Sequence, residues 1–240
     1  MNILKTVSNH LLEQRIIEQP LQYIHSVSGG CINDCYRLEH GFSNFFVKVN
    51  LADKFPKMFQ KEANGLQLLR ETKSIKIPNQ VAYFDESNYS FWVLEWIETG
   101  QSSKDFWFKF GQQLANLHQV KSDKFGLEED NYIGSLPQKN NRFTTWHEFF
   151  FECRLLPQLE MGIQQGWTST KIFKNAENIA KVIEAEFPKE RPALLHGDLW
   201  SGNYIIDSKG NPVLVDPAVY FGNREICLLY TSDAADEAKC

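Results

Sequence analysis

The sequence lacks the features that would identify a membrane, secreted or zinc-binding protein. Its five cysteines include no CxxC pair and form no even set, so neither a zinc site nor a disulfide framework is indicated. No stretch approaches the roughly 18 apolar residues of a membrane span. Charged and amide residues interrupt the N-terminal segment, where a secretory signal would be continuous and apolar. We therefore expect a cytoplasmic protein with reduced thiols and no membrane partner.

The chain also has no excess of positive charge. The formal net charge is −5 at pH 7, and lysines and arginines form no run along the chain. A nucleic-acid partner is therefore not expected, because such a partner requires a basic surface. With 240 residues, of which 42% are hydrophobic and 23% charged, the composition is that of a globular protein with one large domain or two lobes.

The residue pattern predicts an α+β protein with two lobes. The first third alternates like an antiparallel sheet of five strands with one helix, and helical periodicity replaces the alternation after Thr99 and Gly100. We expect an N-lobe at 1–97, a hinge at 98–101 and a mainly helical C-lobe at 102–226. The expected strands lie at 21–28, 35–40, 44–50, 80–85, 90–97, 203–207 and 212–216, and the expected helices at 55–71, 102–119, 143–162 and 168–187.

The last residues of the chain differ in character from those before them. The segment 227–240, CLLYTSDAADEAKC, resembles the translated adapter of a transposase-based sequencing library. We therefore expect a non-native tail and a native chain that continues with further helices after Ile226. The alternative is a genuine short tail.

Polar groups interrupt the apolar runs of the segment LLHGDLWSGNYIIDSKGNPVLVDPA at 194–218. Asn203 follows Asp198 by five residues, and Asp216 follows Asn203 by thirteen, beyond an expected hairpin. Because a hairpin folds back on itself, the three side chains can converge. Oxygens of Asn203 and Asp216 would suit Mg²⁺, which combines a few protein ligands with phosphate oxygens. Asp198 would then act as a base or as an orienting group for an attacking hydroxyl. In the alternative interpretation, these residues only form turns.

The spacing matches the arrangement of protein kinases, in which H-R-D-L-x-x-x-N is followed by an Asp on the next strand. A second pair belongs to the same arrangement. Lys48 lies within an apolar strand, and Glu62 interrupts the apolar face of the following helix. A carboxylate in a buried stripe needs a partner, so we expect an ion pair of the kind that grips the α- and β-phosphates in kinases. Alternatively, Lys48 is a solvated strand residue.

Two segments are assigned to a nucleotide by their position. The turn with Gly29 and Gly30 would cover the phosphates, because glycine permits close approach of the backbone. A Gly-Gly turn otherwise indicates only a hairpin. The backbone at Glu95, Trp96 and Ile97 would face the adenine between the lobes.

Two residues with chemical potential are interpreted as part of the core. His118 follows Leu114 at helical spacing, which favours a packed, hydrogen-bonded histidine over a catalytic one. Cys153 lies in an aromatic-rich helical segment and is expected to be buried.

Five segments carry a family resemblance: HGDLWSGN, DPAVYFGNRE, SGGCIN, FGLEEDNYIGSLPQKN and WHEFFFECRLLPQLE. Together they resemble the fructosamine kinases, also called ketosamine kinases, within the aminoglycoside phosphotransferase-like branch of the protein kinase-like fold. The resemblance covers about residues 5–226. Generic relatives share only the HGD, Asn and DPA elements.

The resemblance implies ATP- and Mg²⁺-dependent phosphorylation of a sugar hydroxyl in a ketosamine of the fructosamine or ribulosamine type, free or bound to protein. The phosphorylated adduct then becomes unstable and leaves the amine. Carried over by residue, Asp198 would be the catalytic base, Asn203 and Asp216 the metal ligands, and Lys48 with Glu62 the pair that grips the phosphates.

The remaining implications concern assembly and completeness. We expect a monomer. The alternative is a redox-linked dimer, because Cys31 matches a glycine-rich-loop cysteine that forms redox-sensitive interchain disulfides in some members of the family. The family pattern continues after Ile226 with an Asp and several helices, whereas this chain has Cys227. Two other functions stay open: a kinase of aminoglycosides, choline or thiamine, and a nucleotide-binding protein without turnover.

Overall fold

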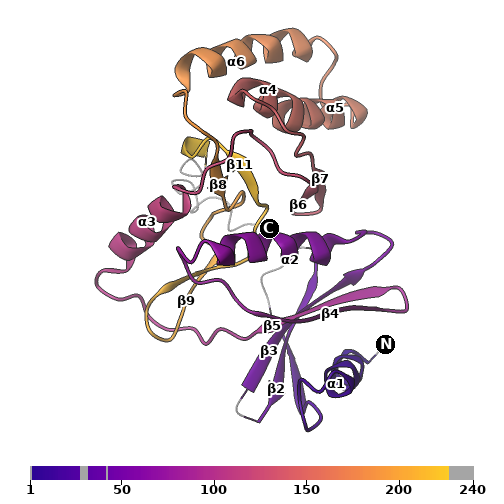
Figure 1. Ribbon diagram of the computed structural model, residues 1–240. Coiled ribbons are helices and arrows are strands. Elements are labelled where there is room, and N and C mark those ends of the chain that lie inside the picture. Colours follow the sequence, from indigo (N-terminus) through magenta and orange to yellow (C-terminus); the bar gives the residue numbers. More distant parts are fainter. Residues whose placement is uncertain (1, 28–31, 42, 227–240) are drawn as a thin grey trace.

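The computed structural model describes residues 2–27, 32–41 and 43–226. Its N-terminal part is built on an antiparallel five-stranded sheet in the order β1-β2-β3-β5-β4, and its C-terminal part is mainly helical (Figure 1). The predicted α+β class is therefore confirmed. The predictions for Gly29, Gly30 and Cys31 lie outside the described residues, as does the predicted tail.

The sheet takes its strands from the first third of the chain, as the alternation predicts. Its strands are β1 (Tyr23–Ser26), β2 (Asp34–His40), β3 (Ser43–Leu51), β4 (Gln80–Glu86) and β5 (Tyr89–Glu95), and α2 (Met58–Glu71) follows β3. Side chains along a strand point alternately to the two faces of a sheet. Val47 and Val49 therefore pack on one face, whereas Lys48 lies on the other, the face that α2 covers. This alternation directs Lys48 toward Glu62 and toward the rest of the molecule.

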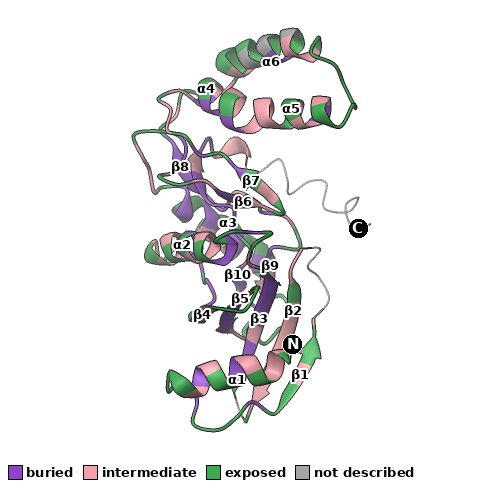
Figure 2. Ribbon diagram, turned by 90° about the vertical axis from the view of Figure 1, so that its right-hand side faces the viewer, coloured by how far each residue is buried: buried purple, intermediate pink, exposed green. Residues whose placement is uncertain are grey.

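The first face is covered by a helix that the sequence analysis did not predict. Helix α1 (Ile3–Glu13) buries Val7 and Leu11 against this face, and Asn2 caps it by accepting a hydrogen bond from the Lys5 N–H at 3.0 Å. Figure 2 places α1 at the end of the molecule opposite α4, α5 and α6 of the C-terminal part. Helix α1 thus completes a core that is separate from the functional site.

The C-terminal part combines helices with three small antiparallel ribbons. Its helices are α3 (Phe106–Leu117), α4 (Trp146–Phe150), α5 (Leu156–Gln164) and α6 (Ile172–Glu186). Strand β6 (Asn131–Ile133) pairs with β7 (Leu136–Gln138), β8 (Ala193–Leu195) with β11 (Tyr220–Gly222), and β9 (Tyr204–Ile206) with β10 (Pro212–Leu214). The β9–β10 hairpin was predicted, and the other two ribbons were not. No helix of the described chain is long and apolar enough to span a membrane.

The predicted helix at 143–162 is present but is not regular throughout. A π-helical segment, η1 (Phe151–Leu155), joins α4 to α5, and the Leu156 N–H donates to the Phe151 carbonyl one residue further back than in an α-helix. Pro157 lies in the first turn of α5 (Leu156–Gln164) and has no N–H for the carbonyl four residues before it. The widened turn is the local response to this missing donor.

The structure confirms that His118 and Cys153 are core residues, with 6% and 5% of their surface exposed. Burial lowers the pKa of His118 to about 4, and the positive charges of Lys121 and Arg224 act in the same direction. Its imidazole is therefore neutral at pH 7. Within the described part of the chain, no hydrogen-bond partner reaches Nε2 of His118.

Candidate active site

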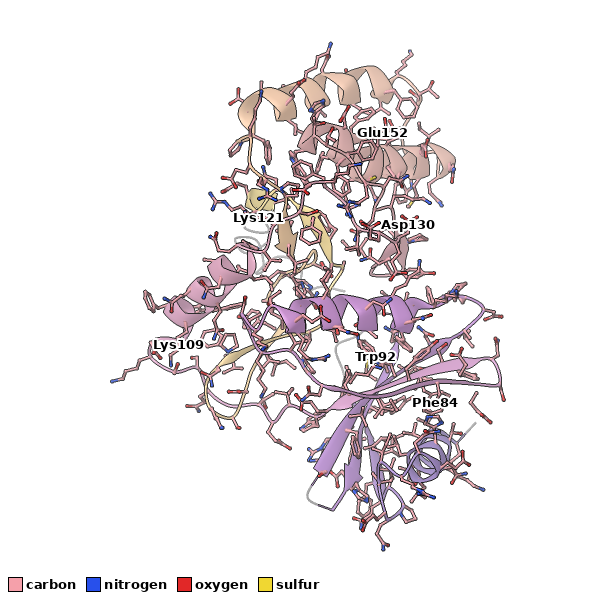
Figure 3. The ribbon with its side chains drawn as sticks, viewed as in Figure 1. Phe84, Trp92, Lys109, Lys121, Asp130 and Glu152 are labelled. Atoms are coloured by element: carbon pink, nitrogen blue, oxygen red, sulfur yellow. The ribbon has the colours of Figure 1, made fainter. Side chains whose placement is uncertain are left out.

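The site is centred on a buried lysine that contacts both parts of the molecule. Lys48 on β3 is 3% exposed, and its Nζ lies 2.7 Å from Glu62 Oε1 on α2 and 2.7 Å from Asp216 Oδ1 in the C-terminal part. The expected Lys48–Glu62 ion pair is therefore present. Nζ also lies 5.5 Å from the centroid of the Trp92 ring, which Figure 3 labels beneath α2.

The charges of this cluster determine one another's protonation. Burial opposes the charged form of Lys48, but the carboxylates of Asp216 and Glu62 outweigh burial and raise the pKa of Lys48 above its ordinary value. Lys48 is therefore a permanent cation. Burial is also the largest effect on Glu62, whose pKa it raises, while Lys48 opposes this change and Asp216 adds to it. Two carboxylates share one ammonium group, so the charge on each carboxylate affects the pKa of the other.

The loop after β8 brings Asp198 and Asn203 together. Asn203 is 6% exposed, and its Nδ2 donates to the Asp198 carbonyl at 2.7 Å and to Asp198 Oδ2 at 3.0 Å. The same nitrogen lies 3.5 Å from the backbone oxygen of Asp216. Because Nδ2 faces these acceptors, Oδ1 of Asn203 is the end of the amide that can serve as a metal ligand.

His196 anchors this loop and takes no part in proton transfer. It is fully buried, its Nε2 lies 2.8 Å from the Val215 carbonyl, and its Nδ1 accepts a hydrogen bond from the Asp198 N–H at 3.4 Å. Burial lowers the pKa of His196 to about 4. The neutral imidazole therefore links the backbone of Val215, which precedes Asp216, to the backbone of Asp198, the candidate base.

Two backbone conformations bring the loop close to the segment after β10. Gly197 has φ +87°, and a Cβ at this position would lie 1.9 Å from the Ala218 carbonyl oxygen. Only glycine therefore permits this approach. Asp216 has φ 54°, a left-handed conformation that is uncommon outside glycine, and such strain concentrates at functional sites.

A pocket of about 260 Å³ opens beside the cluster, between the two parts of the molecule. Its lining includes Glu95, Trp96 and Ile97, the segment predicted to face adenine. The N–H groups of Glu95 and Trp96 already donate to the carbonyls of Asn79 and Asn44. Among the described residues, no acceptor is bonded to the Ile97 N–H, so this group is the available donor for a base. The lining also includes Asp216, the predicted metal ligand, and Thr99 of the predicted hinge. The mostly apolar remainder was not predicted: Val27, Cys35, Phe46, Leu66, Pro78, Leu94, Gly202, Ile205 and Val215.

Strand alternation was the signal that could have identified part of this lining. Phe46 lies two residues before Lys48 and therefore on the same face of β3, and Cys35 is the register partner of Lys48 on β2. Burial raises the pKa of the Cys35 thiol to about 11. Cys35 is therefore a protonated pocket residue and not a nucleophile.

The donor set suits a hard divalent cation that also binds phosphate. Asp216 is 48% exposed at its side chain, and its backbone oxygen lies beside the Asn203 amide. Within the described ranges, no three His, Cys, Asp or Glu side chains gather into a metal cluster. An ion here would therefore need the amide oxygen of Asn203 and oxygens from a bound nucleotide.

Comparisons with known proteins agree with this geometry. The family model described as fructosamine kinase matches residues 3–232. A protein assigned as a probable ketoamine kinase in Synechocystis is 40% identical over 212 residues, which cover 88% of this chain and 71% of the relative. The chloroplastic protein-ribulosamine 3-kinase of Oryza sativa subsp. japonica is 40% identical over 209 residues, which cover 84% of this chain and 60% of that protein.

Solved structures extend the comparison to the fold. A crystal structure from Haemophilus somnus, assigned as a fructosamine-3-kinase, superposes with a TM-score of 0.84 at 29% identity and covers 94% of this chain and 76% of its own. The aminoglycoside phosphotransferase APH(4)-Ia has a TM-score of 0.59 at 13% identity, covers 92% of this chain and 74% of its own, and shows the kinase-like fold alone. Family match, relatives and fold agree, and the chain belongs to the fructosamine kinase family.

Proposed function

We propose that this protein transfers the γ-phosphoryl group of ATP to a sugar hydroxyl of a ketosamine. The observation that carries the proposal is the cluster in which Lys48 bridges Glu62 and Asp216, with Asp198 and Asn203 held beside it, in a member of the fructosamine kinase family. The name of the rice relative, protein-ribulosamine 3-kinase, supports a ketosamine as the acceptor.

ATP would bind in the pocket between the two parts of the molecule. The base would lie against the apolar lining and accept a hydrogen bond from the Ile97 N–H, and the phosphates would extend toward Lys48. Glu62 would hold the ammonium group in place while Lys48 contacts phosphate oxygens. We also propose that 98–101 form the hinge. Gly100 fixes its position there, because its N–H donates to the Ile206 carbonyl at 2.9 Å.

Asn203 and Asp216 would hold Mg²⁺, which neutralises phosphate charge during transfer. The residues of this chain then position the reacting groups. Asp198 would accept the proton of the attacking hydroxyl, since its carboxylate is oriented by the Asn203 amide and its backbone by His196. Phosphoryl transfer requires mainly positioning and charge stabilisation, and the cluster supplies both.

A substrate panel tests the proposal. The protein is incubated with ATP and Mg²⁺ and with one acceptor at a time: a ribulosamine, a fructosamine, an aminoglycoside, choline or thiamine. We expect ATP consumption and a phosphorylated product, identified by mass spectrometry, only with the two ketosamines. Transfer to one of the other acceptors would replace the proposed substrate class. Stabilisation by Mg-ATP without transfer to any acceptor would indicate a nucleotide-binding protein.

We further propose that the protein acts as a monomer in the cytoplasm. The proposed base, metal ligands and phosphate-gripping pair all lie in the same chain, so the proposal requires no residue from a partner subunit. Sedimentation of the reduced protein would show a single species of 27.8 kDa. A stable dimer under reducing conditions would contradict this assignment.

A further inference from the structure

The backbone immediately after Asp216 is held from two sides. On one side, the Ala218 N–H donates to the His196 carbonyl at 2.9 Å. On the other side, Gln138 Nε2 donates to the Ala218 carbonyl at 3.1 Å, and Asn131 Nδ2 donates to the Val219 carbonyl at 2.8 Å. The second side is the β6–β7 hairpin, in which Asn131 and Gln138 are register partners. The hairpin therefore determines where this segment lies relative to the catalytic loop.

The hydrogen bonds of the hairpin form a chain with one possible direction. Asn131 must present its nitrogen to the Val219 carbonyl, so its Oδ1 accepts from Gln138 Nε2 at 2.8 Å and from Asn140 Nδ2 at 2.9 Å. Asn140 Oδ1 then accepts from Arg154 Nη2 at 2.9 Å. The three amides are 6%, 3% and 1% exposed, so water cannot replace a missing partner. A carbonyl at one end and a guanidinium at the other fix the orientation of every amide.

Arg154 is itself held by the π-helical turn. In a regular α-helix, the Cys153 carbonyl would accept a hydrogen bond from the N–H of residue 157, but this residue is proline and has no N–H. Arg154 Nη1 donates to the Cys153 carbonyl at 3.0 Å. The guanidinium carbon lies 4.2 Å from the centroid of the Tyr220 ring and 4.6 Å from that of Phe149. Tyr220 directly follows the segment that the hairpin holds. In Figure 3, Asp130 marks the start of the hairpin and Glu152 marks the π-helical turn above it.

We propose that Arg154, Asn140, Asn131 and Gln138 form a positioning relay that fixes the backbone at 218–219 and thereby the carboxylate of Asp216. None of the four residues is the proposed base or a proposed ligand of the metal or the phosphates, so they are positioning residues. The relay gives a function to residues in two segments, DNYIGSLPQ at 130–138 and RLLPQ at 154–158, that belong to the family resemblance and are not among the elements shared with generic relatives. The inference rests on the proposed function in one respect, because it takes Asp216 as a magnesium ligand.

The left-handed backbone of Asp216 explains why such a relay is needed. A non-glycine residue at φ 54° is strained, and its neighbours must hold it in place. If the contacts at 218–219 are lost, Asp216 can relax, and its carboxylate then leaves the position in which Lys48 holds it and in which its backbone oxygen lies 3.5 Å from the Asn203 amide. The proposed consequence is weaker binding of Mg²⁺, with the nucleotide pocket intact.

Isosteric variants test the relay. Asn131→Asp places a carboxylate oxygen against the Val219 carbonyl, whereas Asn140→Asp keeps the contact with Arg154 but cannot donate to Asn131. The matched control is Asn223→Asp, because Asn223 is 2% exposed and donates to the Pro188 carbonyl at 3.5 Å, outside the hairpin. For each protein, Mg²⁺ is titrated at fixed ATP, and the shift in melting temperature gives the half-saturating Mg²⁺ concentration.

We expect this concentration to rise about 10-fold in Asn131→Asp and less in Asn140→Asp, and to stay unchanged in Asn223→Asp. ATP alone should stabilise all four proteins equally. If Asn131→Asp does not fold, Asn140→Asp carries the test, because its charge pairs with Arg154. An unchanged half-saturating concentration in both relay variants, with a loss of melting temperature like that of the control, would show a purely structural network and overturn the inference.

The same titration separates this inference from the proposed function. If the relay variants shift the Mg²⁺ titration but the wild-type protein phosphorylates no ketosamine, the relay stands and the proposed substrate fails. If ketosamines are phosphorylated and the relay variants titrate like the wild type, the function stands and the relay fails. The absence of any Mg²⁺ effect in the wild type would contradict Asp216 as a ligand and the relay with it.

Discussion

Replacement of Gly197 by alanine is the perturbation with the most clearly defined consequence. The new Cβ would lie 1.9 Å from the Ala218 oxygen, whereas such contacts essentially never fall below 3.0 Å, so the loop and the 216–219 segment must separate by about 1 Å. The φ of +87° adds a backbone penalty of about 1–2 kcal/mol. With an overpacking cost of about 1–3 kcal/mol, we expect the free energy of unfolding to fall by roughly 2–5 kcal/mol.

The effect on activity follows from the same displacement. Asp198 follows Gly197, so a shift of about 1 Å would separate the base from the metal ligand and reduce kcat by about 100-fold. Alanine variants of two other glycines separate the cost of the positive φ from the cost of the steric contact. Gly111 is in α3 with no heavy atom within 4 Å of the position that an alanine Cβ would take, and Gly41 has φ +57° with equally open space. Alanine should stabilise the first by about 0.5–1 kcal/mol and destabilise the second by about 1–2 kcal/mol.

Denaturant unfolding of the three variants, together with kcat at saturating ATP and ketosamine, completes the test. The two control variants should retain the kcat of the wild type. If Gly197→Ala unfolds like Gly41→Ala and also keeps its kcat, the close contact between the loop and the strand has no functional role, and the reasoning is refuted.

Three further predictions address the charges of the site and the core. Glu62→Gln removes one of two carboxylates from Lys48 and should lower kcat/KM for ATP by at least about 10-fold, and an unchanged kcat/KM would show that Glu62 does not orient the lysine. Asn203→Asp sets a carboxylate against Asp198 and should reduce kcat by about 100-fold, whereas a wild-type kcat would exclude the amide hydrogen bond as an orienting contact. The pKa of His118 is about 4 in the folded protein and near 6.5 in the unfolded protein, so the unfolded state binds more protons between these pH values. The free energy of unfolding should therefore fall by about 1.4 kcal/mol for each pH unit from pH 6.5 toward pH 4. His118→Asn should flatten this slope in urea unfolding, and an unaltered slope would contradict the neutral histidine.

Local periodicity was sufficient to predict the elements that carry the proposed ATP site. The alternation in β3, the apolar run of β5 and the 3.6-residue face of α2 are properties of short segments, so the sequence predicted both the sheet and the Lys48–Glu62 pair. The β9–β10 hairpin was predictable for the same reason, and it brings Asn203 near the backbone of Asp216.

Elements that depend on distant partners were missed. Strands β8 and β11 have three residues each and pair across more than twenty positions, so neither has a pattern of its own. The direct contact of Lys48 with Asp216 joins residues 168 positions apart. The amides of the relay illustrate the same limit, because Asn131 and Gln138 donate to carbonyls that lie 88 and 80 positions further along the chain.

Comparison of the wild type with Asp198→Asn tests the central claim most directly. Formation of phosphorylated ribulosamine is followed by mass spectrometry under single-turnover conditions, with Mg-ATP affinity measured in parallel by calorimetry. We expect the variant to bind Mg-ATP like the wild type and to form the product about 10²- to 10⁴-fold more slowly, as befits the loss of a general base. Equal rates of product formation in the two proteins would contradict the assignment of Asp198 and the phosphotransfer site built around it.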